Sequence, residues 1–207
     1  MGFIKEIRKD LRSVMERDPA AGSELEVLLT YSGVHAVIVH RAAHWFYKHG
    51  HKVIARIISQ TMRGITGIEI HPGAKIGKGL LIDHGSGVVI GETAEIGDYC
   101  LLYQGCTLGG TGKDHGKRHP TLGNNVMVGA GAKILGPFKV GDNAKIAANS
   151  VVLREVPPDC TVVGIPGHIA RVHGEKLDHT HTPDPIQLEI DALRQRIEEL
   201  EAALGKK

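Results

Sequence analysis

The chain has 207 residues, of which 42% are hydrophobic and only 4% aromatic, and its formal net charge is +2. This length suits one substantial domain with smaller appendages. The near-neutral charge gives no indication of nucleic-acid binding. No apolar run approaches the roughly 18 residues of a membrane span, and charged residues alternate with apolar ones where a signal peptide would have its apolar core. We therefore expect a cytoplasmic protein with neither a nucleic acid nor a membrane as partner.

Residues 1–66 carry a helical pattern, which predicts an N-terminal α-helical domain. Apolar residues at three- and four-residue spacings predict a first amphipathic helix from Ile4 to Met15. Proline restricts the residue before it, so this helix should end at Arg17-Asp18-Pro19-Ala20, where Asp18 can cap the next helix. Gly64 and Gly67 mark the end of the domain. Three further helices are predicted at Leu25–Leu29, Val34–Tyr47 and Val53–Met62.

An aliphatic residue returns at every sixth position through residues 67–167. The longest run is Leu122, Val128, Ile134, Val140, Ile146 and Val152. Two shorter runs, offset by two residues, are Ile70, Ile76, Ile82, Val88 and then Ile90, Ile96, Leu102, Leu108. A period of six with small residues beside the aliphatic ones is typical of hexapeptide repeats. We predict a mainly β protein whose catalytic domain, residues 67–167, is a left-handed parallel β-helix. Its fourteen markers, at three per turn, give between four and five turns.

Beyond the coil, residues 168–207 are predicted to form a linker and a C-terminal heptad helix. Pro157-Pro158 and residues 164–167 should stop the coil, and the segment through Asp178–Pro183 is polar. Isoleucine and leucine alternating at heptad core positions favour two strands in isolation. We expect a trimeric β-helix to impose three strands instead; the alternative is that the helix packs back on its own subunit. The seam consists of Ile190, Leu193, Ile197, Leu200 and Leu204.

The repeat is interrupted between Leu108 and Leu122, which are fourteen residues apart, two more than two hexapeptides. The intervening loop, residues 109–121, is glycine-rich and basic, and it could either cover a site or be a solvated connection. It is not a Walker loop, because Thr107 stands where that motif needs a glycine and Asp114 follows Lys113.

A second concentration of chemistry surrounds Asp83-His84, with Glu69 and His71 shortly before. A histidine can accept a proton near neutral pH, and a carboxylate bonded to its other ring nitrogen fixes the tautomer. Glu69 precedes His84 by fifteen residues, close to one turn of eighteen, so the two could lie on neighbouring faces of one coil. On the residues alone, a surface or capping role for His84 is favoured over catalysis. The three cysteines form no CxxC pair, which favours reduced, structural thiols.

Several motifs resemble serine O-acetyltransferase, a hexapeptide-repeat acyltransferase family, in the same order and spacing. Gly109-Gly110-Thr111-Gly112-Lys113 together with Arg118-His119-Pro120 separates this family from other hexapeptide acyltransferases. The resemblance covers about residues 16–167, and the helical domain is shorter than in the long forms of the family. The remaining motifs are Arg17-Asp18-Pro19-Ala20, residues 40–45, residues 69–77, Ile82-Asp83-His84, Gly91-Glu92-Thr93 and residues 129–136.

The resemblance implies transfer of acetyl from acetyl-CoA, the co-substrate, to the L-serine hydroxyl, giving O-acetylserine and CoA in cysteine biosynthesis. His84 would be the general base, and Glu69 would replace the aspartate that commonly orients it. Arg118 can pair with the carboxylate of the amino acid and Asp18 and Asp83 with its ammonium group. Four further residues match family positions: His119 in the amino-acid site, and Gly110, Ala130 and Ala148 in an acetyl-CoA groove between subunits. No metal is expected.

We expect direct transfer rather than an acyl-enzyme on Cys100 or Cys106, because no base stands near either cysteine in the sequence. Family members are commonly inhibited by L-cysteine, and hexapeptide β-helices usually form homotrimers. Docking to cysteine synthase is not expected, because the chain ends with Leu204-Gly205-Lys206-Lys207 rather than isoleucine. Two other functions stay open at this point: a γ-carbonic-anhydrase-like zinc hydrase using His71, His84 and His119, and a non-catalytic scaffold.

Overall fold

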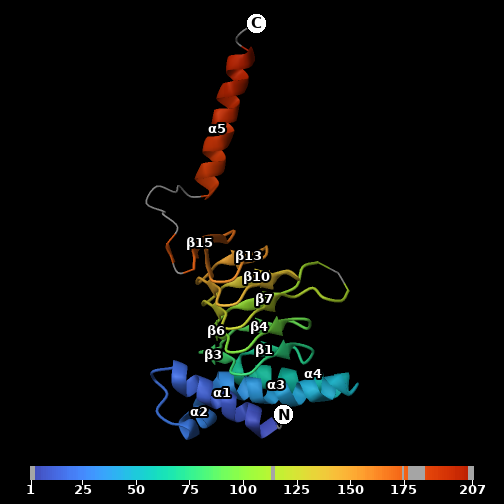
Figure 1. Ribbon diagram of the computed structural model, residues 1–207. Helices are drawn as coiled ribbons and strands as arrows, with labels where there is room; N and C mark the ends of the chain where they lie inside the picture. The colour runs from blue at the N-terminus through green and yellow to red at the C-terminus, as the bar shows by residue number, and fades with distance from the viewer. Residues whose placement is uncertain (1–2, 113–114, 174, 177–184, 205–207) are drawn as a thin grey trace.

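The computed structural model describes residues 3–112, 115–173, 175–176 and 185–204, and it has three parts in chain order (Figure 1). Four helices lie at one end, a stack of short strands follows, and α5 (Pro185–Leu204) stands beyond the far end of the stack (Figure 1). Lys113, the predicted linker through Asp178–Pro183 and residues 205–207 lie outside the described residues. The four helices are α1 (Phe3–Arg17), α2 (Glu24–Thr30), α3 (Ser32–Lys48) and α4 (Lys52–Thr66).

The strands form the three faces of a coil and pair in parallel from one turn to the next, which confirms the predicted β-helix. Sheet A contains β1 (Glu69–Ile70), β4 (Val89–Ile90), β7 (Thr107–Gly109), β10 (Lys133–Leu135) and β13 (Val151–Val152). Sheet B contains β2 (Lys75–Ile76), β5 (Glu95–Ile96), β8 (Thr121–Leu122) and β11 (Lys139–Val140). Sheet C contains β3 (Leu81–Asp83), β6 (Leu101–Tyr103), β9 (Met127–Val128), β12 (Lys145–Ile146), β14 (Cys160–Val163), β15 (His168–Val172) and β16 (Glu175–Lys176).

The period of six arises because each strand directs one aliphatic side chain into the coil. Ile134 and Ile146 are fully buried. A smaller side chain fills the core two residues earlier in each repeat, and Cys100, Cys106 and Cys160 occupy such positions as buried free thiols. Val88 also belongs to this inner set rather than to the strands. The Val88 carbonyl accepts a hydrogen bond from the amide of Glu69, and the Cys106 carbonyl accepts the equivalent hydrogen bond, one turn later, from the amide of Val89.

The structure explains one detail of the predicted coil and corrects another. Leu108 and Leu122 lie on successive strands, β7 and β8, so the loop inserts eight residues into a single six-residue step and replaces no hexapeptide. Pro157-Pro158 do not stop the coil, because they lie at a corner, where no ladder N–H is needed. The coil continues through a parallel bridge at Val156 and through β14, which completes about five turns.

The coil ends where β15 pairs antiparallel with β14. Residues 168–172, which the sequence assigned to the linker, therefore belong to sheet C. A second correction concerns the helical end: Ser23, not Asp18, caps α2, since its side chain accepts from the amide of Glu26. Within the described residues, no helix is both long and apolar enough to cross a membrane.

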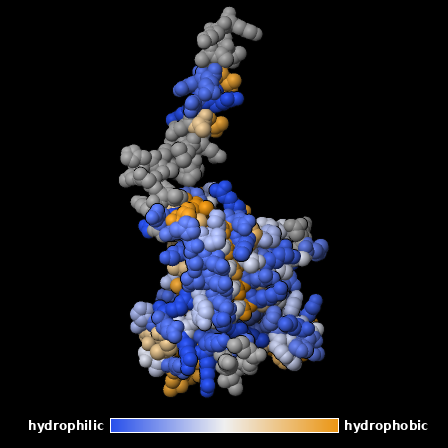
Figure 2. All heavy atoms as spheres, in the orientation of Figure 1, coloured by the Kyte–Doolittle hydropathy of each residue, from blue (hydrophilic) through white to orange (hydrophobic). Residues whose placement is uncertain are grey.

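Apolar side chains are exposed mainly on the helical parts of the molecule. Figure 2 shows them at the helical end and along α5, and also in a narrow stripe on the coil and at its end nearest α5; the rest of the coil face is mostly polar. Every side chain described between Ile190 and Glu201 is exposed, so the heptad seam has no cover from its own subunit in this range. At the N-terminal end, one face of the four-helix part, formed by α3 and α4, packs under the first turn of the coil, and the other face meets solvent.

Candidate active site

The predicted site residues lie on two different edges of the triangular coil. We name the turns that lead from sheet C to sheet A the His84 edge; its turns are residues 84–88, 104–106, 129–132 and 147–150. We name the turns that lead from sheet A to sheet B the Arg118 edge; its turns are residues 71–74, 91–94, 110–120 and 136–138. Asp83, His84, Ala130 and Ala148 lie on or beside the first edge, and Gly110, Arg118 and His119 on the second.

The turn that carries His84 is two residues longer than the turn above it. Asp83 is in register with Tyr103 and Val89 with Thr107, so residues 84–88 occupy the place that residues 104–106 fill one turn later. The offset in the aliphatic repeat therefore marks the insertion that contains His84. His84 has a positive φ of 58°, and its side chain is 73% exposed, with Nε2 3.8 Å from Asp83 Oδ1. The inserted turn presents an imidazole to the outside of the coil.

Asp18 reaches the same edge from the end of α1. Its Oδ2 accepts a hydrogen bond from the Tyr31 hydroxyl at 2.8 Å, and its Oδ1 accepts from the amide of Ala20 at 2.8 Å. The hydrogen bond to Asp18 is the main cause that raises the pKa of Tyr31 to about 12, and the charge of Asp83 adds to it. Asp18 therefore lies against the Tyr31 hydroxyl, and the neighbouring Ser32 donates to the His84 carbonyl at 3.3 Å, which places a carboxylate near this edge that could pair with an ammonium group.

Glu69 does not contact His84 in the isolated chain. Its Oε2 lies 3.2 Å from Arg63 Nε, and its Oε1 accepts a 3.5 Å hydrogen bond from Gln60 Nε2, both on α4. Among the described residues, no hydrogen bond or ion pair joins Glu69 to His84. The extra methylene of glutamate, compared with aspartate, allows this carboxylate to reach the helix. The role of Glu69 as the orienting carboxylate stays a prediction.

On the Arg118 edge, the end of the inserted loop is fixed to the turn of residues 91–94. The Thr93 hydroxyl accepts from the amides of Arg118 and His119 at 3.0 and 3.1 Å, and Nδ1 of His119 lies 2.9 Å from that hydroxyl. Lys117 Nζ donates to the Thr93 carbonyl at 2.7 Å. A Cβ on Gly91 would stand 1.9 Å from the His119 ring, so only glycine leaves room for that ring.

The side chain of Arg118 is held by Glu92, which in turn is held by α3. Arg118 Nη2 lies 2.5 Å from Glu92 Oε2, and the Tyr47 hydroxyl donates to Glu92 Oε1 at 2.9 Å. The hydrogen bond from Tyr47, followed by that from Arg118, lowers the pKa of the Glu92 carboxyl. Burial, and the positive charge of Arg118, lower the pKa of His119. This edge therefore combines an ionised carboxylate, a guanidinium and an imidazole that resists protonation.

The three positions matched to an acetyl-CoA groove divide between the edges. A Cβ on Gly110 would stand 3.1 Å from Arg118 Cγ. Ala130 and Ala148 lie on successive turns of the His84 edge, where the amide of Asn149 donates to the Ala130 carbonyl. Small side chains at these three positions leave the backbone accessible to a long, narrow ligand.

Sequence reasoning missed the residues that support the site: Tyr31, Tyr47, Glu92 and Thr93. Glu92 and Thr93 lie in a motif that supported the resemblance, yet the spacing gave no sign of their contacts. Within the described residues, no group of three or more histidine, cysteine or acidic side chains could hold a metal ion.

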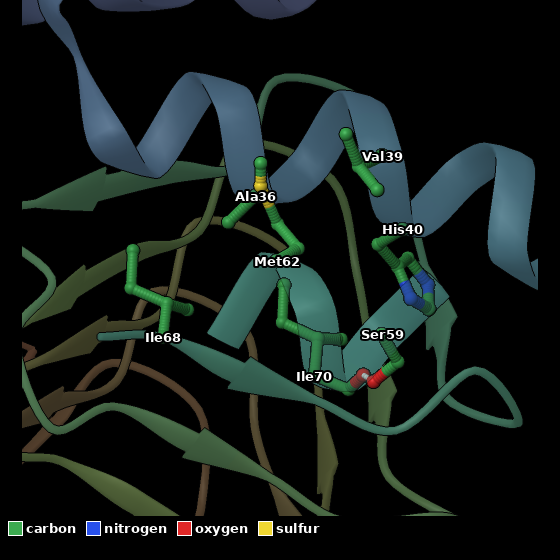
Figure 3. Close-up of a pocket in the computed structure, with 7 residues that line it drawn as sticks. All are labelled: Ala36, Val39, His40, Ser59, Met62, Ile68 and Ile70. Carbon is green, nitrogen blue, oxygen red and sulfur yellow. Dashed lines mark hydrogen bonds between the residues drawn. The ribbon is translucent and has the colours of Figure 1, made fainter. Parts of the chain in front are cut away.

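The cavity in Figure 3 lies between α3, α4 and β1 and is not a substrate site. Its volume is about 10 Å³, which is near the lower limit for one water molecule. His40 lines it together with Ser59, whose hydroxyl donates to the carbonyl of Ile70 (Figure 3). His40 Nδ1 is buried without a hydrogen-bond partner, and burial lowers the pKa of this residue to about 3. We assign this histidine a structural role.

Comparisons with known proteins identify the family of the chain. The family "Serine acetyltransferase, N-terminal" matches residues 2–38, and "Bacterial transferase hexapeptide (six repeats)" matches residues 119–154. A serine acetyltransferase of Synechococcus elongatus is 58% identical over 205 residues, which cover 98% of this chain and 84% of the relative.

Two solved structures have the same fold. One is serine acetyltransferase of Neisseria gonorrhoeae in complex with serine, with a TM-score of 0.79 and 44% identity over 82% of this chain and 69% of that one. The other is a serine acetyltransferase in complex with cysteine, with a TM-score of 0.81 and 42% identity over 82% of this chain and 66% of that one. Identity at this level over nearly the whole chain means that it belongs to the serine acetyltransferase family of acyltransferases.

Proposed function

We propose that this chain transfers the acetyl group of acetyl-CoA directly to the hydroxyl of L-serine, with His84 as the general base. The observation that carries the proposal is the position of His84 on an inserted turn, with an exposed imidazole 3.8 Å from Asp83. Asp18 binds the Tyr31 hydroxyl, and the neighbouring Ser32 donates to the His84 carbonyl. The known relatives support serine as the acceptor, since one of them is solved with serine bound.

In the proposed reaction, His84 removes the serine hydroxyl proton while the oxygen attacks the thioester carbon. The C–O bond forms, and the negative charge moves to the carbonyl oxygen of a tetrahedral intermediate. The C–S bond then breaks, and the CoA thiolate takes the proton from the imidazolium, so that O-acetylserine and CoA leave and His84 is neutral again. Such base catalysis contributes about 10²–10⁴-fold to the rate.

Two chains are needed to build one site. Arg118, which would bind the serine carboxylate, lies on a different edge from Asp83 and His84. Because the coil is rigid, its two edges can face a common substrate only when the His84 edge of one subunit meets the Arg118 edge of another. We propose a homotrimer closed by this heterologous contact, with Gly110 of one subunit and Ala130 and Ala148 of the next lining the acetyl-CoA groove.

Direct transfer is favoured over an acyl-enzyme by the state of the thiols. Burial raises the pKa of Cys100 to about 11 and that of Cys106 to about 12. The thiolate is the nucleophilic form of cysteine. Neither side chain can therefore act as an acyl acceptor at neutral pH from its place in the core.

Regulation by the end product follows from the same groups. L-cysteine carries the same carboxylate and ammonium as serine, and a structural relative is solved with cysteine bound. We propose that cysteine competes with serine at Arg118, Asp18 and Asp83. The test follows the loss of the acetyl-CoA thioester absorbance, rather than released thiol, at several concentrations of cysteine and serine, because cysteine is itself a thiol.

The test is a thiol-release assay with acetyl-CoA and serine, homoserine or water as acceptor. We expect serine-dependent release of CoA by the wild type and a loss of about 10²–10⁴-fold in kcat for His84→Ala, with an unchanged oligomer mass. His173→Ala is the matched control, because His173 also has a positive φ and lies 3.8 Å from an aspartate, at 75% exposure. Near-normal turnover by His84→Ala, or thiol release that is independent of serine, would contradict the proposal.

A further inference from the structure

The contact between α3 and the inserted loop connects the helical part of the molecule to the proposed substrate arginine. Tyr47 lies on α3, its hydroxyl donates to Glu92 Oε1, and Glu92 Oε2 binds Arg118 Nη2. Tyr47 and Arg118 are 71 positions apart in the sequence, yet both bind the carboxylate of Glu92. Each oxygen of Glu92 receives one of the two donors.

Tyr47 is held on a firmly anchored element. On α3, Arg41 binds Asp10 through two nitrogens and donates to the Gly77 carbonyl at 2.9 Å. The Tyr47 ring packs edge-on against His71, with 5.6 Å between the ring centroids. The hydroxyl of Tyr47 therefore has a fixed position relative to the first turns of the coil.

The guanidinium of Arg118 depends on Glu92 for its position. Thr93 fixes the backbone of Arg118, but among the described residues Glu92 is the one hydrogen-bond partner of the guanidinium. A guanidinium has five N–H donors in a planar fork. Contact at Nη2 leaves donors for a second carboxylate. It also restricts rotation of a long side chain, so less rotamer entropy is lost when the substrate binds.

The charges agree with a positioning role. Hydrogen bonds from Tyr47 and Arg118 lower the pKa of Glu92, so this carboxylate stays ionised at neutral pH. Burial, and the hydrogen bond to Glu92, raise the pKa of Tyr47, so its hydroxyl stays a donor. At neutral pH, Tyr47 therefore stays protonated, Glu92 stays ionised and Arg118 stays charged, so the two hydrogen bonds keep the same donors and acceptor.

We infer that Tyr47 is a positioning residue for recognition of the amino-acid carboxylate, acting through Glu92 on Arg118. The inference rests on the proposed function, in which Arg118 binds the carboxylate of serine. It assigns part of the substrate specificity to the helical end of the molecule, outside the coil and its loop.

The first experiment is Tyr47→Phe, which removes only the hydroxyl. We expect the KM for serine to rise about three- to tenfold, which is less than the roughly 10–150-fold for direct loss of a hydrogen bond to a charged group, because Tyr47 acts through Glu92. The kcat and the KM for acetyl-CoA should stay within about twofold of the wild type. Tyr99→Phe is the matched control, because Tyr99 lies at the turn from sheet B to sheet C, away from both edges.

The second measurement separates positioning from general damage. Serinamide keeps the hydroxyl and the ammonium group of serine but lacks its carboxylate. We expect Tyr47→Phe to lower the kcat/KM for serine and to leave that for serinamide unchanged. An equal loss for both acceptors, or no rise in the KM for serine, would overturn the inference.

The third measurement asks whether Tyr47 acts through Glu92. Glu92→Gln should raise the KM for serine more than Tyr47→Phe does, because it removes the charge beside Arg118. The double variant should resemble Glu92→Gln alone, since the hydroxyl then has no ionised partner to hold. Additive effects would overturn the proposed route. Failure of the proposed function is distinguishable, because the wild type would then release no CoA in response to serine.

Discussion

The two edges of the coil that carry the candidate site are built in opposite ways. The Arg118 edge is closed by contacts within the chain: Glu92, Thr93 and Tyr47 hold Arg118 and His119. The His84 edge is open, with an imidazole 73% exposed on an inserted turn. One edge is ready to hold a charged ligand, and the other presents a base without a substrate pocket around it. This difference supports the proposal that the coil supplies two half-sites, which a second chain joins.

The largest effect on the closed edge is expected from Arg118→Ala. Loss of a charge-assisted, bidentate contact should lower kcat/KM for serine by about 10–150-fold, chiefly through KM, whereas His84→Ala acts on kcat. Arg118→Lys should recover only part of the loss, because an ammonium group cannot form the planar fork. Steady-state kinetics with both variants check this. An unchanged KM for serine in Arg118→Ala would remove carboxylate recognition from this edge.

A smaller loss is expected from Gly91→Ala. The new Cβ would stand 1.9 Å from the His119 ring, which must leave its place against Thr93. We expect the KM for serine to rise about tenfold, because the displaced ring disturbs its neighbour Arg118. Gly64→Ala on α4 is the control, since a Cβ there meets nothing within 4 Å. Wild-type kinetics for Gly91→Ala would show that the packing of His119 is irrelevant to binding.

Acid should weaken the helical end through His40. The pKa of this buried ring is about 3 when the protein is folded, whereas an unfolded histidine titrates near 6.5. Between these values the unfolded state binds the proton and the folded state does not, so the unfolding free energy falls as the pH falls. The stability is fully present above pH 6.5 and decreases by about 1.4 kcal/mol per pH unit below it. Chemical denaturation at several pH values should show this slope, and His40→Gln should lose it.

The smallest effect on activity is expected at α5, far from both edges. Ile190 and Ile197 alternate with Leu193 and Leu200 along an exposed seam. In a parallel homotrimer, each seam residue meets its own copy, so Leu200→Cys should cross-link between chains under mild oxidation without a change in kcat. The three native cysteines are buried and give little background. Glu198→Cys, beside the seam, is the control and should stay monomeric on a denaturing gel. Equal cross-linking at both positions would contradict a parallel seam.

The periodic parts of the molecule could be predicted because the core itself is periodic. Spacings of three and four residues located α1, α3 and α4, and the period of six located the coil, since each pattern records which side chains enter the core. The two-residue offset even marked the inserted turn of His84. The contact of Tyr47 with Glu92 has no such signal, because it joins residues 45 positions apart through side chains alone. The ion pair of Glu69 with Arg63 could not be predicted for the same reason, because it depends on the length of the Glu69 side chain.

We propose a two-chain site that contains the His84 edge of one subunit and the Arg118 edge of another. Its most direct test is complementation between His84→Ala and Arg118→Ala chains, co-expressed with different tags and purified as mixed oligomers. If the edges meet between subunits, each mixed trimer contains one intact pair among its three interfaces, and about one third of wild-type activity returns. A mixed oligomer no more active than either variant alone would place the whole site within one chain and contradict the account.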